Sequence, residues 1–190
     1  EIRLTVPCTG SLLEWLRERA ARTFDLLGGV AARGQVELLT GGFYEPILSV
    51  LPDHDKIGQI ERLTTFLKSN FGVRPRGMWL GECGYVPGVD ELLREAAIRY
   101  FFVDTHGLLF AERPPVYGPY APLYCRTGVA AFGRDPESSH QVWSAREGYP
   151  GDPHYRDFYR DIGFDLPIEY IGPYVHPEGH RLYTGIKYHA

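Results

Sequence analysis

The chain has 190 residues, a formal net charge of −4 and 44% hydrophobic residues, which is enough for a domain with a buried core. The small negative charge gives no electrostatic reason to expect binding to nucleic acid or to an anionic membrane. No apolar run is long enough to span a bilayer, and residues 1–6 lack the basic start and apolar run of a signal peptide.

Cys8, Cys83 and Cys125 are odd in number and far apart, and they form no zinc-binding spacing. This usage predicts a reduced, cytoplasmic setting. The 13 tyrosines leave two interpretations open. They are either the rim of a well-packed core or the flat walls of a cleft for a sugar.

Strand and helix patterns alternate along the first half of the chain. Strands are predicted at residues 2–6, 36–39, 77–80 and 99–103. Between them, a helix capped by Ser11 is expected to be interrupted at Gly28-Gly29 and to end at Gly34. A second helix is capped by Asp53 or Asp55 and ends at Asn70 and Gly72, and a third covers residues 90–99. The alternation predicts an α/β fold with right-handed crossovers and a parallel sheet.

The second half of the chain is less regular. Residues 112–125 are rich in proline and tyrosine and predict an ordered excursion across the rim of the sheet. A further strand is expected at residues 129–133. Residues 134–165 are polar and predict a long loop insertion with a short helix at residues 155–162. Long loops inside domains are usually functional.

Each predicted strand is followed by a polar residue: Glu45, Glu82, and Asp104 with His106. Such groups at one rim of a parallel sheet are typical of a barrel active site. Glu82 stands in a turn of small residues between Trp79 and Tyr85, which makes it a candidate catalytic carboxylate. The alternative is a structural carboxylate that caps the next helix or pairs with an arginine.

Five segments carry a resemblance to a known family. Gly41-Gly-Phe-Tyr-Glu-Pro-Ile-Leu48 and Trp79-Leu-Gly-Glu-Cys-Gly-Tyr85 resemble the second and third sequence signatures of glycoside hydrolase family 57. Gln141-Val-Trp-Ser, Glu147-Gly-Tyr-Pro-Gly-Asp152 and Thr184-Gly-Ile-Lys-Tyr-His189 resemble its 1,4-alpha-glucan branching enzyme subgroup. The resemblance covers nearly the whole chain.

The resemblance implies part of an incomplete (β/α)7 barrel over residues 1–190 that acts on alpha-glucans with retention of configuration. It assigns the catalytic nucleophile to Glu82, a sugar-facing tryptophan to Trp79 and a carboxylate near the substrate to Glu45. The family's first signature and its general acid/base, an Asp in a fourth signature, are not found in this sequence. We therefore expect the 190 residues to be a piece of a longer chain that lacks both ends of the barrel.

The expected function is that of a 1,4-alpha-glucan branching enzyme, which forms alpha-1,6 branches through a covalent glycosyl-enzyme. The alternatives are a 4-alpha-glucanotransferase or alpha-amylase of the same family, or a non-catalytic glucan-binding module. Further substrate contacts are predicted at Tyr85, His106 and Trp143, although Tyr85 and Trp143 fit a structural role equally well. The expected partner is an alpha-glucan, without nucleic acid or membrane.

No metal or cofactor is expected. Asp104 with His106, and Asp53-His54-Asp55, are the two groupings that suggest a metal. Polysaccharide deacetylases have a similar incomplete barrel, but they need an acidic pair with a His-x-x-x-His pattern, and neither of these two groupings contains that pattern. Cys83 has no histidine or other base nearby in the sequence, so a small packing residue is the expected role rather than a nucleophile.

Overall fold

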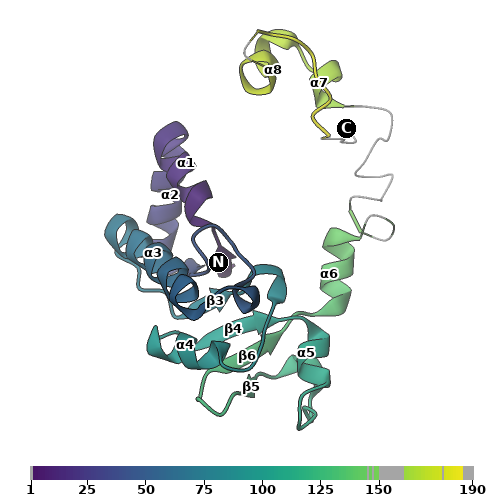
Figure 1. The fold of residues 1–190 in the computed structure, drawn as a ribbon. Coiled ribbons are helices and arrows are strands. Elements are labelled where there is room, and N and C mark those ends of the chain that lie inside the picture. Colours follow the sequence, from purple (N-terminus) through teal and green to yellow (C-terminus); the bar gives the residue numbers. More distant parts are fainter. Residues whose placement is uncertain (1, 145, 147, 150–160, 177, 186–190) are drawn as a thin grey trace. The chain divides into compact units, whose positions relative to one another are not determined.

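Parallel strands alternate with helices along the first part of the chain (Figure 1). The computed structural model describes residues 2–144, 146, 148–149, 161–176 and 178–185. The chain divides into two units, Glu1–Arg134 and Asp135–Ala190. The strands are β1 Leu4–Pro7, β2 Val36–Leu39, β3 Gly77–Trp79, β4 Tyr100–Val103, β5 Leu123–Tyr124 and β6 Ala130–Gly133. The helices of the first unit are α1 Gly10–Arg19, α2 Ala21–Ala32, α3 Asp53–Phe71, α4 Val89–Glu95 and α5 Thr105–Leu109, with short 3-10 turns η1 Leu48–Val50, η2 Gly81–Cys83 and η3 Gly118–Tyr120.

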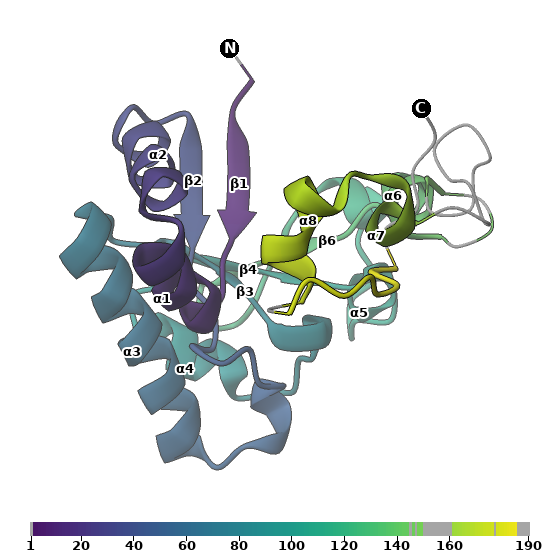
Figure 2. The ribbon, with the colours of Figure 1, turned by 90° about the horizontal axis from the view of Figure 1, so that it is seen from above.

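Strands β1 and β2 run side by side in parallel (Figure 2). Strands β3, β4 and β6 form a second parallel set, with β5 antiparallel at its edge. A parallel bridge between Thr40 and Met78 connects the two sets. The parallel strands therefore lie in chain order, β1-β2-β3-β4-β6, without the reversal of a doubly wound sheet. The predicted α/β fold with parallel strands is confirmed, whereas the incomplete barrel and the loop insertion stay predictions.

Alternate residues of the strands face opposite sides of the sheet. Met78 and Phe101 are buried in one apolar core with Leu93 of α4. The opposite side carries the rings of Trp79, Tyr100, Phe102 and Phe132, whose neighbouring centroids lie 5.6–6.1 Å apart. These four rings are only partly buried or exposed. A second core lies among α1, α2 and α3, where Leu13, Phe24, Phe43, Leu63 and Leu67 are buried.

Several predicted helix boundaries are wrong. Thr9, not Ser11, caps α1 by accepting a hydrogen bond from the amide of Leu12. The break between the first two helices falls at Ala20, and α2 continues through Gly28-Gly29. Residue Pro52 precedes α3 without a side-chain cap, so neither predicted aspartate acts as its N-cap.

Other helix ends follow the backbone conformation of single residues. The predicted end of α3 is confirmed, because Gly72 has a φ of 67° and accepts the left-handed conformation without strain. Helix α4 ends earlier than predicted, since Ala97 has a φ of 61°. Helix α5, which the sequence pattern did not predict, starts at Thr105 directly after Asp104.

The second unit contains α6 Pro136–Trp143, α7 Ile162–Asp165 and α8 Ile168–Val175. Helix α6 was not expected in the polar segment, although Asp135 is a good N-cap, accepts from the amide of Ser138 and is followed by Pro136 at the first helical position. The short helix predicted at residues 155–162 lies almost entirely outside the described residues. None of the helices described in either unit has the length and apolarity needed to cross a bilayer.

Asp161 holds two segments of the second unit together. Only 3% of its surface is exposed, and its carboxylate accepts hydrogen bonds from the amides of Gly163, Thr184 and Gly185 and from the Thr184 hydroxyl at 2.8–3.0 Å. Burial raises the pKa of Asp161, but these hydrogen bonds outweigh it and lower that pKa to about 2. Thr184 and Gly185 are therefore tied to the start of α7 by an ionised carboxylate.

Candidate active site

Glu45, Glu82, Asp104 and Arg134 follow β2, β3, β4 and β6 at the carboxyl ends of these strands. The strands are parallel and in register, so their ends meet at one edge of the sheet. Strand β3 is fixed to the end of β2 by hydrogen bonds at 3.0 Å between Thr40 and its neighbours Gly77 and Trp79. The predicted gathering of polar groups at one edge is therefore present.

Glu82 lies in a strained turn. Only four described residues other than glycine have a positive φ, and Glu45 (53°), Glu82 (53°) and Cys83 (55°) are three of them. Each such residue costs about 1–2 kcal/mol. Backbone strain of this kind persists where the surrounding structure enforces it, and it is concentrated at functional sites. The turn presents an exposed Glu82 at the edge of the sheet.

The turns that carry Glu45 and Glu82 are packed backbone against backbone. A Cβ atom built on Gly81 would lie 2.5 Å from the carbonyl oxygen of Pro46, which is closer than real Cβ contacts. A Cβ atom on Gly42 would lie 2.4 Å from the Pro46 ring. Glycine is thus required at both positions, and the two strained glutamates have a fixed spacing along the edge.

A cavity of about 230 Å³ opens beside these turns. Its lining includes Glu45 and Trp79, together with Thr9, Thr40 and Gly41. The Trp79 ring is half-buried and lies 6.1 Å from the ring of Phe102, on the side of the sheet that carries the aromatic residues. An indole face beside a carboxylate is suited to a sugar ring, which offers an apolar face and hydroxyl donors.

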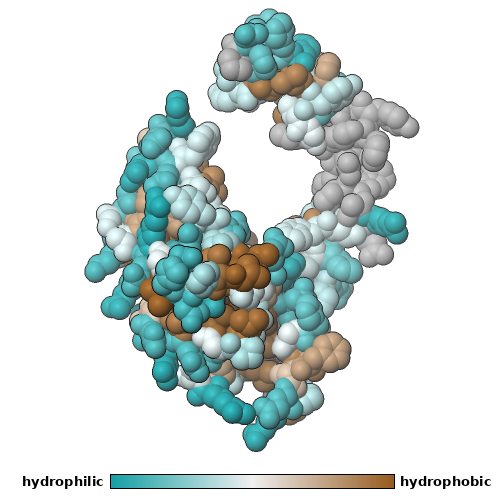
Figure 3. Space-filling view, viewed as in Figure 1, coloured by the Kyte–Doolittle hydropathy of each residue, from teal (hydrophilic) through white to brown (hydrophobic). Residues whose placement is uncertain are grey.

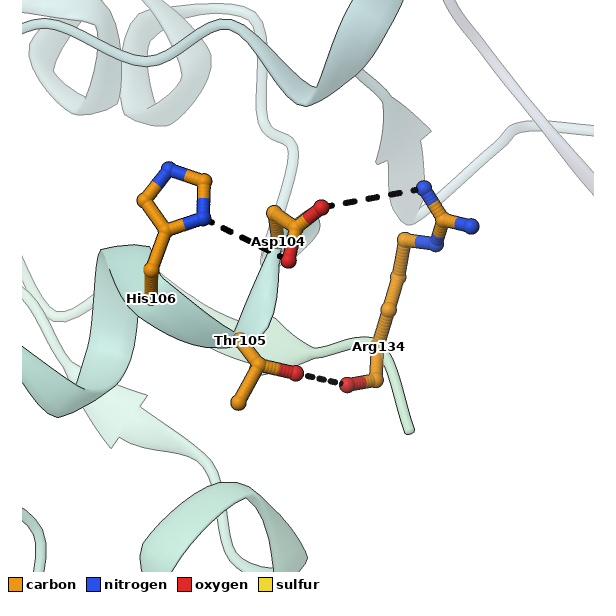
Figure 4. A network of polar contacts seen from close by, with 4 residues as sticks. All are labelled: Asp104, Thr105, His106 and Arg134. Carbon is orange, nitrogen blue, oxygen red and sulfur yellow. Dashed lines mark hydrogen bonds and ion pairs between the residues drawn. The ribbon is translucent and has the colours of Figure 1, made fainter. Parts of the chain in front are cut away.

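Asp104 lies between the side chains of His106 and Arg134 (Figure 4). Its carboxylate lies 3.4 Å from Nδ1 of His106 and 4.0 Å from the guanidinium of Arg134. The hydroxyl of Thr105 donates to the backbone carbonyl of Arg134. These contacts tie the end of β4 to the end of β6 and engage both carboxylate oxygens of Asp104.

Cys83 connects this network to Glu82. Burial raises the pKa of its thiol, and the neighbouring carboxylates of Asp104 and Glu82 raise it further. Arg134, hydrogen-bonded to the sulfur, acts in the opposite direction without reversing the shift. A raised thiol pKa means that Cys83 is protonated near neutral pH, which fits a packing role and not a nucleophile.

The comparison with known proteins decides the family. The family model described as glycosyl hydrolase family 57 matches residues 1–188. The chain belongs to this family. Alpha-amylase 1 of Dictyoglomus thermophilum is 43% identical over 101 residues, which cover 53% of this chain and 15% of that protein. A probable 1,4-alpha-glucan branching enzyme of Mycobacterium tuberculosis is 32% identical over 163 residues, or 78% of this chain and 29% of that protein.

A solved structure has a similar fold. The crystal structure of the alpha-amylase AmyC from Thermotoga maritima superposes with a TM-score of 0.76 and 34% identity, over 100% of this chain and 47% of that one. The chain therefore spans less than half the length of each of these three proteins.

Tyr85 does not line the cavity with Trp79. Its hydroxyl donates to Asp90 at 2.9 Å, and its ring stacks on Phe101, which faces the helices. Asp90 is buried and also accepts from the hydroxyl of Thr127 at 2.7 Å. Burial and the Asp90 hydrogen bond raise the pKa of Tyr85. These contacts give Tyr85 a structural function, and its contact with substrate stays a prediction.

Trp143 and His106 stand on helices. Trp143 ends α6 in the second unit and is 71% exposed. His106 lies in the first turn of α5 beside Asp104 and is mostly exposed. The roles predicted for both in substrate binding stay predictions.

Arg134 is the residue at this edge that sequence reasoning missed. It directly follows the strand predicted at residues 129–133, just as Asp104 follows β4, so the rule that identified the other strand ends also applies to it. Among the described residues no three His, Cys, Asp or Glu side chains converge as a metal site. His54 lies 3.1 Å from the carboxylate of the adjacent Asp55, and both are exposed at the start of α3.

Proposed function

We propose that this chain carries the nucleophile of a retaining alpha-glucan enzyme, and that Glu82 is this nucleophile. The observation that supports it is the position of Glu82, in a family 57 chain, on a strained turn at the carboxyl end of β3. Backbone packing fixes the turn from which this exposed side chain extends at the rim. Such preorganisation is what nucleophilic attack on an anomeric carbon requires.

The retaining mechanism needs a second carboxyl group roughly 5–5.5 Å from the first. Glu82 attacks the anomeric carbon, and the second group protonates the leaving oxygen and later deprotonates the acceptor. We do not assign this role to Asp104, because both of its oxygens are engaged by His106 and Arg134. The general acid/base is expected outside this chain.

Glu45 and Trp79 are proposed to bind the sugar next to the bond that is cleaved. Both line the 230 Å³ cavity, and the Glu45 turn packs directly against the turn of Glu82. The indole would stack on a glucose ring while the carboxylate accepts from its hydroxyl groups. His106, Tyr85 and Trp143 are further candidates with less structural support.

Within this class we propose a 1,4-alpha-glucan branching enzyme, in which the acceptor is a 6-hydroxyl of another glucan chain. The observation that favours it is the share of this chain that the sequence alignment covers. The match to the probable branching enzyme covers 78% of the chain, against 53% for the match to alpha-amylase 1. The second candidate is an alpha-amylase, which the structural match to AmyC over the whole chain favours. A 4-alpha-glucanotransferase and a glucan-binding module are the remaining alternatives.

Incubation of the full-length protein with amylose separates these activities. A branching enzyme lowers iodine staining with few new reducing ends, and its products become shorter after debranching. An amylase releases reducing ends in proportion to the loss of staining, and a glucanotransferase yields products that debranching does not change. Glu82→Gln is expected to abolish turnover, while the exposed Glu18→Gln on α1 serves as the matched control. Glucan binding without turnover in the wild-type protein would contradict the enzyme proposal.

A further inference from the structure

The opposite end of the sheet holds a larger cavity, of about 970 Å³. It is lined by the three segments that lead into β3, β4 and β6, so it lies at the amino ends of these strands and away from Glu82. Four arginines line it: Arg74, Arg76, Arg94 and Arg99. No aspartate or glutamate is part of this lining, although the whole chain has a net charge of −4.

These four arginines take part in none of the ion pairs formed among the described residues. Arg94 has a structural explanation, because it lies in the last turn of α4, where a cation stabilises the helix dipole. Arg76 and Arg99 precede strands, so no helix dipole accounts for their charges. The inference therefore depends mainly on these two.

Arg76 and Arg99 are neighbours across two parallel strands. The amide of Arg99 donates to the carbonyl of Arg76 at 2.7 Å, and the register continues directly as Gly77 beside Tyr100. Neighbouring strands lie about 4.8 Å apart. Like charges in adjacent positions of a sheet destabilise it. An anion bound between the two guanidinium groups would turn this repulsion into attraction.

Guanidinium groups bind phosphate through paired hydrogen bonds, which makes arginine the usual residue for phosphate recognition. The cavity is much larger than a phosphate ion alone requires, and it falls within the range of about 300–1,000 Å³ found for small-molecule sites. The rings of Tyr100 and Tyr124 also line it. The flat faces of these two rings are suited to contact a sugar ring that is attached to the phosphate.

We infer that this arginine-lined cavity binds the phosphate group of a small phosphorylated ligand of the size of a sugar phosphate. The site is separate from the proposed active site, because it lies at the other ends of the same strands. Its occupancy would stabilise the amino ends of β3 and β4. It would not require any residue placed above in the catalytic or sugar-binding machinery.

Titration calorimetry on the full-length protein at low ionic strength tests this inference, with glucose 1-phosphate, inorganic phosphate and glucose as separate probes. Glucose 1-phosphate is expected to bind. Weaker binding of inorganic phosphate would assign the ligand to phosphorylated sugars, and equal binding would assign it to free phosphate. Each of Arg76→Gln and Arg99→Gln should weaken binding about tenfold, the loss expected for a charged hydrogen bond.

Two controls make the result specific. Arg22→Gln removes an exposed arginine on α2, outside the cavity, and should leave the affinity unchanged. Arg99→Lys keeps the charge but not the paired donors, and should lose less affinity than Arg99→Gln. Without ligand, Arg76→Gln should melt no lower than the wild type, because it removes a like-charge contact. The inference is overturned if neither phosphate probe binds, or if both glutamine variants bind like the wild type.

Discussion

Replacing Gly81 by alanine tests whether the packing of the two turns positions Glu82. The added Cβ atom would lie 2.5 Å from the carbonyl oxygen of Pro46, whereas a carbon and an oxygen in contact are about 3.3 Å apart or more. The Glu82 turn or the Pro46 turn must therefore move by about 0.8 Å, the difference of these distances. Overpacking of this kind costs about 1–3 kcal/mol.

The movement is expected to lower activity as well as stability, because a displacement of about 1 Å at a catalytic group can cost about 100-fold in rate. Urea unfolding and kcat/KM on amylose, both measured on the full-length protein, give the two effects separately. Gly58→Ala is the control. A Cβ atom there meets nothing within 4 Å inside helix α3. The free energy of unfolding of this variant should therefore rise by about 1 kcal/mol. Wild-type stability and rate for Gly81→Ala would refute the reasoning.

Three further substitutions have defined outcomes. Asp161→Asn should destabilise the protein at neutral pH. Because the pKa of Asp161 falls to about 2 on folding, its stabilisation is present above the unfolded pKa of about 3.9 and is lost as the pH falls towards 2. Wild-type and variant unfolding curves should thus converge in acid, and a constant difference would contradict this. Tyr85→Phe should cost about 1–2 kcal/mol because Asp90 loses a donor, with an unchanged KM for glucan; a raised KM at unchanged stability would indicate a sugar contact instead. Asp104→Asn should weaken glucan binding or stability, and loss of the basic limb of the pH–rate profile would contradict this because it would identify Asp104 as the general acid.

Apolar side chains exposed at the surface of the first unit are expected to limit its solubility. Figure 3 shows apolar atoms exposed beside polar ones. The exposed residues include Phe110, Val116, Tyr117 and Tyr120, which are 73–91% accessible and belong to or border the proline- and tyrosine-rich segment. Exposed apolar groups favour association. The isolated 190 residues are therefore expected to be poorly soluble, and a cooperative, concentration-independent melt would contradict this.

The order of strands and helices can be predicted because the side chains that face the core recur at strand or helix spacing. This spacing of apolar residues is visible in the sequence. The apolar faces of α3 and of the strands at residues 36–39, 77–80 and 99–103 are direct consequences of their core contacts. Glu45, Glu82 and Asp104 were found for the same reason, since each follows a strand. The same rule applies to Arg134, which follows the strand at residues 129–133, so this residue could have been predicted in the same way.

Other features depend on contacts between distant residues and leave little trace in the sequence. The stacking of Tyr85 on Phe101 depends on which face of the sheet Phe101 takes. The cap of α1 falls on Thr9 instead of Ser11, a shift of two residues between equally suitable side chains. The juxtaposition of Arg76 and Arg99 requires the register of β3 on β4, which the sequence does not specify.

The most direct test of the central claim is to trap the glycosyl-enzyme. Full-length protein incubated with a slowly turned-over glucosyl donor, then denatured and digested, should yield one peptide whose mass is increased by a glucosyl group. We predict that this peptide contains Glu82 and that fragmentation places the ester on its carboxylate. A glucosyl group on a different carboxylate, or wild-type turnover by Glu82→Gln, would contradict the account.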